Sequence, residues 1–458
     1  MKKHLYLLLA ALSLFIVPVY THAQEIITVA GVGIEGWTGD KDAAVSAALD
    51  WPSGVAIDRD SNLYIADANN NIIRKVKNGI ITTVVGTGFR AGTGYGSFSG
   101  DGGPASAATL FFPSGVAVDT LGRLFIADQG NNCIREVDTN GIITTVAGIG
   151  GAGNFGYSGD GAAANAALLN TPTRVAVDTS GNIYIADSHN SVIREVTLLT
   201  GNIATIAGTG VNGYGGDGGP AVSAQLSWVN DVAVDRPGNV YIADTYNGLI
   251  REIDLTGNIN TIAGSGISGY SGDGGPATAA DLFEPSGIAV DTFGNVFFSD
   301  IGNSSVRKIS ATDTITTIAG VDTPGYNGDG RYAPSAKLWY PEGLATIGHN
   351  LYIADRGNFR VREIVPHSYF LAVNNVIGAK GSINLFPNPN QGSFTISVNT
   401  GFDEQAHIVI TNLTGEQVTN TDAQTNAHVN INLNQPPGIY FVSAITAHGV
   451  LNEKLIIN

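Results

Sequence analysis

The chain has 458 residues, of which 60 are glycine and only 14% are charged, and its formal net charge is −16. A chain of this length can form a large domain and a second, smaller one. The high glycine content and low charge are typical of an all-β protein with many tight turns, and they exclude a helical bundle. The negative charge disfavours a nucleic-acid partner, because such a surface repels phosphate backbones.

Residues 1–23 have the features of a secretory signal peptide. Lys2 and Lys3 form a basic end, residues 5–19 are mostly apolar, and the small residue Ala23 precedes the expected cleavage site. The alternative is a membrane anchor, but the apolar run is short and no second span follows it. We therefore expect an exported mature chain without a transmembrane segment.

Residues 24–365 contain one sequence pattern six times. Each copy is Ala-Asp-x-x-Asn-x-x-x-Arg, with serine replacing alanine in the fifth, and successive aspartates are 55 to 61 positions apart. The pairs are Asp67/Arg74, Asp128/Arg135, Asp187/Arg194, Asp244/Arg251, Asp300/Arg307 and Asp355/Arg362. A period of this size, built from short apolar runs and turn residues, indicates one supersecondary unit stacked repeatedly.

The second copy shows how each repeat is built. Four short runs, at 114–119, 124–128, 132–137 and 142–147, are β-branched or apolar and are separated by turns rich in glycine, asparagine and aspartate. Runs of this kind predict β-strands, and four antiparallel strands per repeat make one propeller blade. The sequence therefore predicts an all-β fold with a six-bladed β-propeller over 24–365.

The sixth copy ends at Val365 without a fourth strand. Residues 26–31 match 142–148 and 315–320, which are fourth strands in other copies. We therefore expect the N-terminal strand to complete the last blade, which joins the ends of the ring and removes an open sheet edge.

The copies resemble NHL repeats. They match the patterns Pro-x-Gly-Val-Ala-Val-Asp, Gly-Asn-Ile-Tyr-Ile-Ala-Asp and Asn-x-x-Ile-Arg of that family, in phase, over residues 25–365. The resemblance implies a six-bladed NHL propeller. It implies no particular reaction, because relatives include binding modules and a few lyases.

The repeated Asp–Arg pairs have two interpretations. They could form a ring of charged binding sites, or each pair could tie two adjacent strands together. The second interpretation is favoured, because a ligand site rarely needs the same residues in every blade. A paired carboxylate and guanidinium also make a strong structural tie.

A second repeated element, Gly-Asp-Gly or a variant, lies between the copies and usually follows an aromatic residue. Its aspartates are Asp40, Asp101, Asp160, Asp217, Asp273 and Asp329. Calcium binding is an alternative, but calcium takes roughly six to eight oxygen ligands and most of these loops supply one carboxylate. We therefore interpret the loops as structural packing. No cofactor is expected, and a calcium-like divalent cation is the alternative.

The topology predicts where a ligand would bind. In a four-stranded meander, the connections between strands two and three and between successive blades open on one face of the disc, here called the loop face. The Gly-Asp loops and the Asp-x-x-Asn turns therefore share the loop face, while tight turns occupy the opposite face. Long loops on a rigid scaffold are the usual place for function.

The copies differ where each first strand opens, at the loop-side mouth of the central channel. Three copies have Ser-Gly there, whereas the others bring Arg174, Asn230, Asp231 and Glu342 toward one opening. Such convergence predicts a polar ligand or a divalent cation. Glu342 and Asn230 also resemble the metal ligands of gluconolactonase-type propellers. That family's third ligand, an acid beside glycine, is absent, since Asp231 lies one place further on. The favoured interpretation is that these positions have drifted and that Arg174 pairs with a neighbouring acid.

Other catalytic patterns are missing from the propeller. The NHL lyase that cleaves amidated-peptide precursors uses a histidine-ligated zinc. Here His189 and His349 lie in turns on opposite faces and His367 lies at the propeller's edge, so no three-histidine site is expected. The single cysteine, Cys133, lies in an apolar strand pattern and is expected to be a buried, inert thiol.

The repeat stops after Val365. Residues 366–381 are interpreted as a linker, and alternating short strands over 382–458 predict a small β-sandwich. This segment resembles the type A C-terminal sorting domain of the type IX secretion system, in its Phe-Pro-Asn-Pro-x-x-Gly-x-Phe start, its Gly-x-Tyr-x-Val strand and its terminal Lys-Leu-Ile-Ile. The resemblance implies carriage across the outer membrane of a Gram-negative bacterium by that machinery, with release or anchoring at the cell surface.

We therefore expect a secreted or cell-surface propeller whose loop face binds an extracellular protein, peptide or glycan. No complete catalytic set is present, so the expected role is binding without catalysis. The alternative is a metal-dependent hydrolase or lyase, gluconolactonase-like, with its site at Glu342, Asn230 and Asp231.

Overall fold

The computed structural model describes residues 24–88, 96–365, 381–401, 403–412, 417–433, 435–446 and 449–458. The chain divides into two compact units, Met1–Pro366 and His367–Asn458. The predicted signal peptide, most of the predicted linker and His367 lie outside the described residues. The helices of the described residues are three-residue 3-10 turns, and none is long and apolar enough to cross a membrane.

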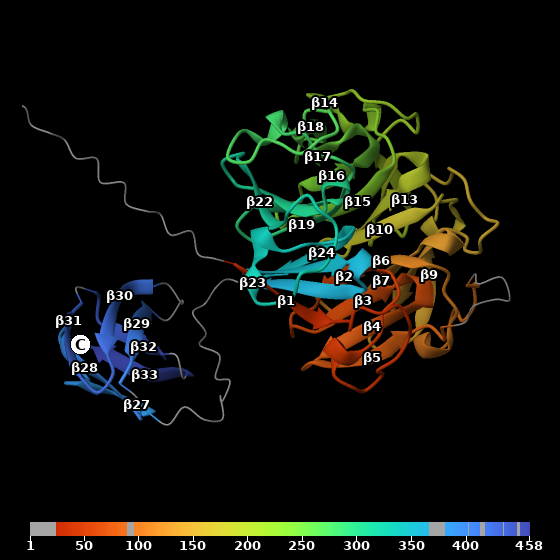
Figure 1. Ribbon diagram of the computed structural model, residues 1–458. Coiled ribbons are helices and arrows are strands. Elements are labelled where there is room, and N and C mark those ends of the chain that lie inside the picture. Colours follow the sequence, from red (N-terminus) through yellow and green to blue (C-terminus); the bar gives the residue numbers. More distant parts are fainter. Residues whose placement is uncertain are drawn as a thin grey trace, which may run out of the picture. The chain divides into compact units, whose positions relative to one another are not determined.

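The first unit is a ring of six antiparallel sheets, the blades, whose innermost strands gather around a common centre (Figure 1). The innermost strands of blades 1 to 6 are β2 (Pro52–Ile57), β6 (Pro113–Val118), β10 (Pro172–Val177), β15 (Val229–Val234), β19 (Pro285–Val290) and β24 (Pro341–Ile347). The second strands are β3 (Leu63–Asp67), β7 (Leu124–Asp128), β11 (Ile183–Asp187), β16 (Val240–Asp244), β20 (Val296–Asp300) and β25 (Asn350–Asp355). The predicted propeller is confirmed.

The outer half of each blade has the same order. The third strands are β4 (Ile72–Lys77), β8 (Cys133–Val137), β12 (Val192–Val196), β17 (Leu249–Ile253), β21 (Ser305–Ile309) and β26 (Arg360–Val365). The fourth strands are β5 (Ile80–Val85), β9 (Ile143–Ala147), β13 (Ile203–Ala207), β18 (Asn258–Ala263), β22 (Ile315–Gly320) and, in blade 6, β1 (Glu25–Ala30). Short outer strands are added in blades 4 and 6 by β14 (Gly219–Pro220) and β23 (Arg331–Tyr332).

The ring is closed by the N-terminal strand, as predicted. Strand β1 pairs antiparallel with β26, with Glu25 opposite Val365 and Ile26 opposite Ile364. Ile26 is fully buried in the same apolar cluster as Ile364. The first and last parts of the propeller therefore share one sheet, the sixth blade, which joins the two ends of the ring.

Two sets of 3-10 turns lie between the strands. One set connects second and third strands: η2 (Ala68–Asn70), η4 (Gln129–Asn131), η6 (Ser188–Asn190), η8 (Thr245–Asn247), η10 (Ile301–Asn303) and η12 (Arg356–Asn358). The other set lies in the connections between blades: η1 (Ala44–Ser46), η3 (Ala105–Ala107), η5 (Ala164–Ala166), η7 (Ala221–Ser223), η9 (Ala277–Ala279) and η11 (Ala333–Ser335).

The hydrophobic core lies between neighbouring blades. Phe125 and Ile134 of blade 2, for example, pack in one cluster with Val175 and Ile185 of blade 3. Both faces of every sheet are therefore covered, which explains why the strands are apolar on both sides. Near the axis the blades are so close that a Cβ atom at Gly54 would lie 2.6 Å from the carbonyl oxygen of Ser114 in the next blade. Only glycine allows this approach.

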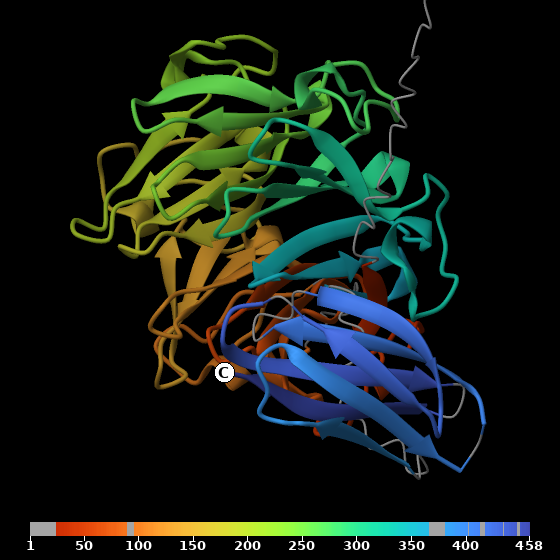
Figure 2. The same ribbon diagram turned by 90° about the vertical axis from the view of Figure 1, so that its left-hand side faces the viewer.

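The second unit is a small β-sandwich, drawn in blue in Figure 2, and the predicted fold is confirmed. One sheet has the order β27 (Gly381–Phe386), β28 (Ser393–Thr400) and β31 (His428–Asn432). The other has the order β30 (Gln417–Gln424), β29 (Gln405–Asn412), β32 (Gly438–Thr446) and β33 (Gly449–Ile457). Both sheets contribute to one core, for example Ile396 from the first and Val442 from the second. Strand β27 begins one residue before the predicted boundary.

Candidate functional site

Each repeated arginine links two acids. Arg135 in β8 is fully buried, its Nη1 lies 3.4 Å from Oδ2 of Asp128, and its Nη2 lies 2.6 Å from Oδ1 of Asp101. Asp128 is also fully buried, whereas the side chain of Asp101 is 41% exposed. The same three-residue tie recurs as Asp67–Arg74–Asp40, Asp187–Arg194–Asp160, Asp244–Arg251–Asp217, Asp300–Arg307–Asp273 and Asp355–Arg362–Asp329.

The tie is completed by an asparagine and an aromatic ring. Asn131 donates to Oδ2 of Asp128 at 2.8 Å, and the N–H of Phe111 donates to Oδ1 at 2.8 Å. The guanidinium of Arg135 lies over the ring of Phe98, 4.8 Å from its centroid. Burial raises the pKa of Asp128 to about 6, although Asn131, the Phe111 N–H and the Arg135 charge oppose the shift.

The predicted Asp–Arg pair is present and buried in all six blades, which fits the structural interpretation. The aspartates of the Gly-Asp loops have the same role, because each one pairs with the buried arginine of its own blade. The two repeated elements of the sequence form one unit, which fastens each loop onto its sheet.

The channel mouth is occupied by Arg174, which is only 5% exposed. Its Nη1 donates to the carbonyl oxygens of Ser114 at 2.6 Å and Thr173 at 3.1 Å. Its Nη2 donates to the carbonyl oxygen of Ser53 at 2.8 Å and to Oε1 of Glu342 at 3.1 Å. One guanidinium from blade 3 therefore satisfies acceptors from blades 1, 2 and 6.

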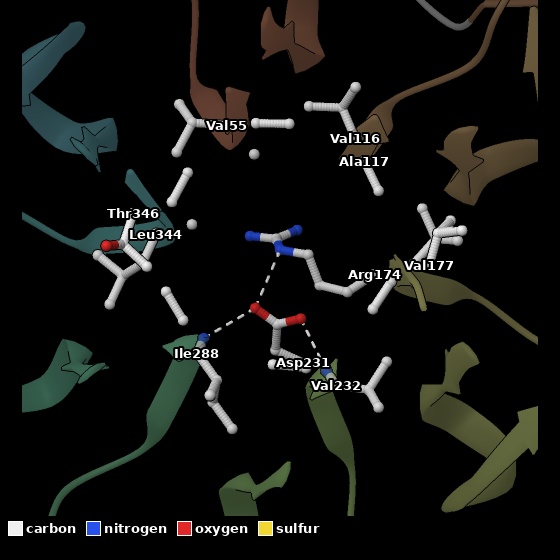
Figure 3. Close-up of a pocket in the computed structure, with 18 of the residues that line it drawn as sticks. Val55, Val116, Ala117, Arg174, Val177, Asp231, Val232, Ile288, Leu344 and Thr346 are labelled. Atoms are coloured by element: carbon white, nitrogen blue, oxygen red, sulfur yellow. Dashed lines mark hydrogen bonds and ion pairs between the residues drawn. The ribbon is translucent and has the colours of Figure 1, made fainter. Parts of the chain in front are cut away.

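Asp231 comes from the neighbouring blade 4 and points toward the guanidinium of Arg174 (Figure 3), with 3.8 Å between Asp231 Oδ2 and Arg174 Nε. Its carboxylate accepts hydrogen bonds from the N–H groups of Ile288 at 2.9 Å and Val232 at 2.7 Å. Burial raises the pKa of Asp231 to about 7, while the charge of Arg174 and the two N–H groups lower it. Arg174 and Asp231 stand at the position where the other four blades have glycine.

Glu342 connects the mouth to the rim of the loop face. Its Oε1 pairs with Arg174, and its Oε2 accepts from Nη1 of Arg356 at 2.9 Å. The guanidinium of Arg356 in turn lies over the ring of Trp51, 4.0 Å from the centroid, which is a cation–π contact. A continuous set of charged contacts thus runs from the axis to an exposed tryptophan.

The structure brings together three of the four predicted mouth residues. Arg174, Asp231 and Glu342 form one cluster, but the amide of Asn230 instead donates to Oγ of Ser286. Arg174 pairs with both acids, as the favoured interpretation expects. Both acids already pair with a guanidinium, so the cluster does not fit the predicted divalent cation. The described residues contain no group of three His, Cys, Asp or Glu side chains arranged to hold a metal.

Beneath the cluster lies a channel cavity of about 220 Å³. All six innermost strands line it, mostly with valine, alanine, isoleucine and leucine side chains (Figure 3). Because Arg174 and Asp231 stand at the openings of β10 and β15, they line the loop-side end of this cavity.

The loop face carries a group of aromatic residues that the sequence did not single out. The residue directly before each innermost strand has a left-handed backbone, and four of these residues are aromatic: Trp51 (φ 56), Phe112 (φ 50), Trp228 (φ 49) and Tyr340 (φ 49). A bulky side chain is rare in this conformation, and its cost of about 1–3 kcal/mol is often found at functional sites. Trp51 and Tyr340 are 40% and 53% exposed.

Two clefts open between these aromatic residues. The cleft between blades 6 and 1 has about 400 Å³ and is lined by Trp51, Trp339, Tyr340, Arg356, Gly357 and Phe359. The cleft between blades 2 and 3 has about 620 Å³ and is lined by Phe111, Phe112, Gln129, Gly130, Asn132, Ala152, Phe155, Asn170, Thr171 and His189. Both volumes are within the range of small-molecule sites, about 300–1,000 Å³.

A pairing of aromatic residues with glycine could have revealed this surface in the sequence. In three blades the residue two places before the innermost strand is aromatic, and the middle residue of the following 3-10 turn is glycine: Phe111 with Gly130, Phe283 with Gly302 and Trp339 with Gly357. A Cβ at Gly130 would lie 2.5 Å from the Phe111 ring. The ring therefore rests directly on the turn.

Of the remaining predicted residues, His189 lines the cleft between blades 2 and 3, whereas His349 and Cys133 line neither cleft. His349 lies between β24 and β25 on the opposite face, stacked on Phe293 with 5.3 Å between ring centroids, whereas His189 lies in η6 on the loop face. Cys133 is buried, as predicted, and burial raises the pKa of its thiol.

Family models match both units of the chain. The model described as Secretion system C-terminal sorting domain matches residues 384–458. The model described as Teneurin NHL domain matches 32–95, 87–154 and 266–324, and the NHL repeat model matches 169–194. Teneurin-1 of Mus musculus is 30% identical over 278 residues, which are 54% of this chain and 10% of teneurin-1. This chain thus corresponds to a small part of that relative.

Solved structures show the same fold. A protein of unknown function from Bacteroides thetaiotaomicron VPI-5482 is similar with a TM-score of 0.55 and 18% identity, covering 75% of this chain and 76% of that chain. An auxiliary nutrient binding protein from Bacteroides ovatus ATCC 8483 is similar with a TM-score of 0.53 and 17% identity, covering 75% and 77%. At these identities the likeness is one of fold.

Proposed function

We propose that the loop face of this chain binds an extracellular glycan, peptide or protein without catalysing a reaction. The chain is an NHL-repeat β-propeller followed by a C-terminal sorting domain of the type IX secretion system. It is therefore secreted or held at the surface of a Gram-negative bacterium. The sorting domain is the part that engages the secretion machinery. The propeller is then the part that acts outside the cell.

The observation that carries this proposal is the set of aromatic side chains around the channel mouth. Trp51, Trp339 and Tyr340 are 40%, 43% and 53% exposed and line one cleft. Exposed, rigidly held aromatic residues are enriched at binding surfaces, because they offer a large contact area and lose little conformational freedom. The similarity in fold to an auxiliary nutrient binding protein is consistent with binding as the function.

The hydrolase or lyase alternative requires acids that can act on a substrate or a metal. Asp231 and Glu342 are both nearly buried and paired with Arg174, and Glu342 is paired with Arg356 as well. Measurement of the metal content of the purified protein tests this alternative. One bound ion per chain that is lost in Glu342→Gln would favour the enzyme over the binding module.

Glycan and peptide arrays probed with the mature chain test the proposal. We expect binding by the wild type that is lost in a loop-face variant. The double variant Trp51→Ala/Trp339→Ala tests the cleft between blades 6 and 1, and Phe155→Ala tests the cleft between blades 2 and 3. Phe293→Ala is the matched control, because Phe293 is also exposed (61%) but lies in the β19–β20 turn on the opposite face. Binding that survives both the double variant and Phe155→Ala, or that is lost in the control, would contradict a loop-face site.

A further inference from the structure

The cleft between blades 2 and 3 has a lining that differs in chemistry from the rest of the surface. The ten residues that line it contain three phenylalanines, two asparagines and one glutamine, and none is Asp, Glu, Lys or Arg. Partial burial lowers the pKa of His189, which favours the neutral form of its ring. A chain with a net charge of −16 thus has a cleft of about 620 Å³ without a single formal charge in its wall.

The aromatic rings of this cleft differ in how closely they are supported by the backbone. Phe111 rests on the backbone of Gly130, where a Cβ atom would come within 2.5 Å of the ring. Phe155, in the connection between blades 2 and 3, is 60% exposed. Rings of this kind present a flat apolar surface at low cost in side-chain entropy.

Carboxamides stand beside these rings. The side chain of Gln129 in η4 is half-buried and makes no hydrogen bond to any described residue, so its amide can donate to and accept from a ligand. Asn132 is used locally instead, because its Oδ1 accepts from the N–H of Thr171 at 2.9 Å. The cleft therefore combines apolar faces with an uncharged polar group that can bond in both directions.

The aromatic surface continues beyond the cleft into blade 4. The ring of His189 lies 4.3 Å from that of Trp228, and Trp228 is stacked on Tyr246 with 4.8 Å between centroids and an interplanar angle of 11°. Because His189 lines the cleft and Tyr246 is 59% exposed, the surface is long enough for more than one ring of a chain-like ligand.

We propose that the cleft between blades 2 and 3 binds an uncharged oligosaccharide, whose sugar rings stack on Phe111 and Phe155 and whose hydroxyls bond to Gln129. This inference rests on the proposed function and names its ligand class. Sugar rings have an apolar C–H face and a rim of hydroxyls that both donate and accept, which is the complement of this lining.

Other ligand classes fit the cleft less well. An acidic glycan would meet no cation in the lining and a negatively charged protein around it. A peptide held through its main chain would need a free strand edge, whereas the lining residues belong to turns and connections.

The test is affinity electrophoresis of the mature chain in native gels that contain a soluble neutral polysaccharide, with β-glucan, galactomannan, xyloglucan and dextran tried in turn. A further gel that contains polygalacturonate tests whether the chain binds an acidic polysaccharide. We expect at least one neutral polymer to retard the wild type and polygalacturonate not to. Titration calorimetry with oligosaccharides of the retarding polymer should then show binding that is weakened about tenfold or more by Phe155→Ala.

The control is again Phe293→Ala, because Phe293 and Phe155 are exposed to the same extent, 61% and 60%, so neither truncation should disturb the fold. Gln129→Ala should weaken binding as well. The inference is wrong if no neutral polymer retards the wild type, if Phe155→Ala binds as the wild type does, or if polygalacturonate is bound through Phe155. The arrays could instead show a peptide that the wild type binds and the loop-face variants do not. In that case the proposed function is supported and only the inference of an oligosaccharide ligand is wrong.

Discussion

The Nη2 atom of Arg174 lies 3.1 Å from Oε1 of Glu342, although the two residues are 168 positions apart in the chain. This contact crosses the axis of the ring, from blade 3 to blade 6. It exists only because the propeller is closed, and both side chains are nearly buried. Loss of this contact would therefore indicate that the whole ring has opened, and not that a single blade has changed.

Arg174→Gly is expected to destabilise the propeller strongly. The change leaves Asp231 and Glu342 buried without their shared cation, and loss of one partner of a buried ion pair costs about 3–5 kcal/mol. Thermal and urea unfolding of the mature chain measure the loss. The double variant Arg174→Gly/Asp231→Gly restores the glycine of the other four blades and removes one stranded acid. It should lose less stability than the single variant, and equal losses would show that the two residues are not coupled.

Asp231 makes stability depend on pH in a definite direction. Burial raises its pKa to about 7, whereas in the unfolded chain the value is about 3.9. Between about pH 4 and pH 7 the folded chain retains a proton that the unfolded chain releases, so the contribution of this group to stability falls as pH rises. Asp231→Asn cannot ionise. The melting temperature of the variant minus that of the wild type should therefore increase from about pH 4 to pH 7 in calorimetry at constant ionic strength, and a constant difference would contradict the assignment.

The repeated tie predicts unequal effects for its members. Arg251 contacts buried Asp244 and half-exposed Asp217 with its two Nη atoms. Arg251→Lys keeps the charge but cannot reach both acids with one ammonium group, so we expect a loss of about 1–3 kcal/mol. Asp217→Asn should cost less than about 1 kcal/mol, because its side chain is 38% exposed. Chemical unfolding of both variants tests the order, and a larger effect of Asp217→Asn would be inconsistent with the tie.

The closing strand should be important for stability although it is a single short segment. Ile26 is fully buried in the cluster that also contains Ile364, and Ile26→Ala is expected to cost about 2–5 kcal/mol. Ile27, on the other side of β1, is only partly buried, and Ile27→Ala is the matched control with an expected loss of about 1 kcal/mol. Limited proteolysis should also cut the Ile26 variant faster near its N-terminus.

Local patterns in the sequence predicted much of this molecule. Strands could be placed because short apolar runs alternate with turn residues, and their repetition indicated six blades. The Asp–Arg pair was predictable because its members are seven positions apart across a turn. The sequence did not predict that each arginine also pairs with a second acid. Asp101 and Arg135, for example, are 34 positions apart and meet only when the loop folds back over the blade.

The sequence by itself determined the propeller, its closure by residues 26–30, the sorting domain and the structural pairing of each Asp–Arg pair, because these depend on periodicity and on motifs within one repeat. Only the tertiary structure decided that Arg174 takes both Asp231 and Glu342 as partners and that Phe111, Phe155 and His189 line one cleft. Those side chains come from different blades, and no sequence period encodes a contact between them. Their distances are set by closure of the ring, which brings the ends of separate strands together at one axis.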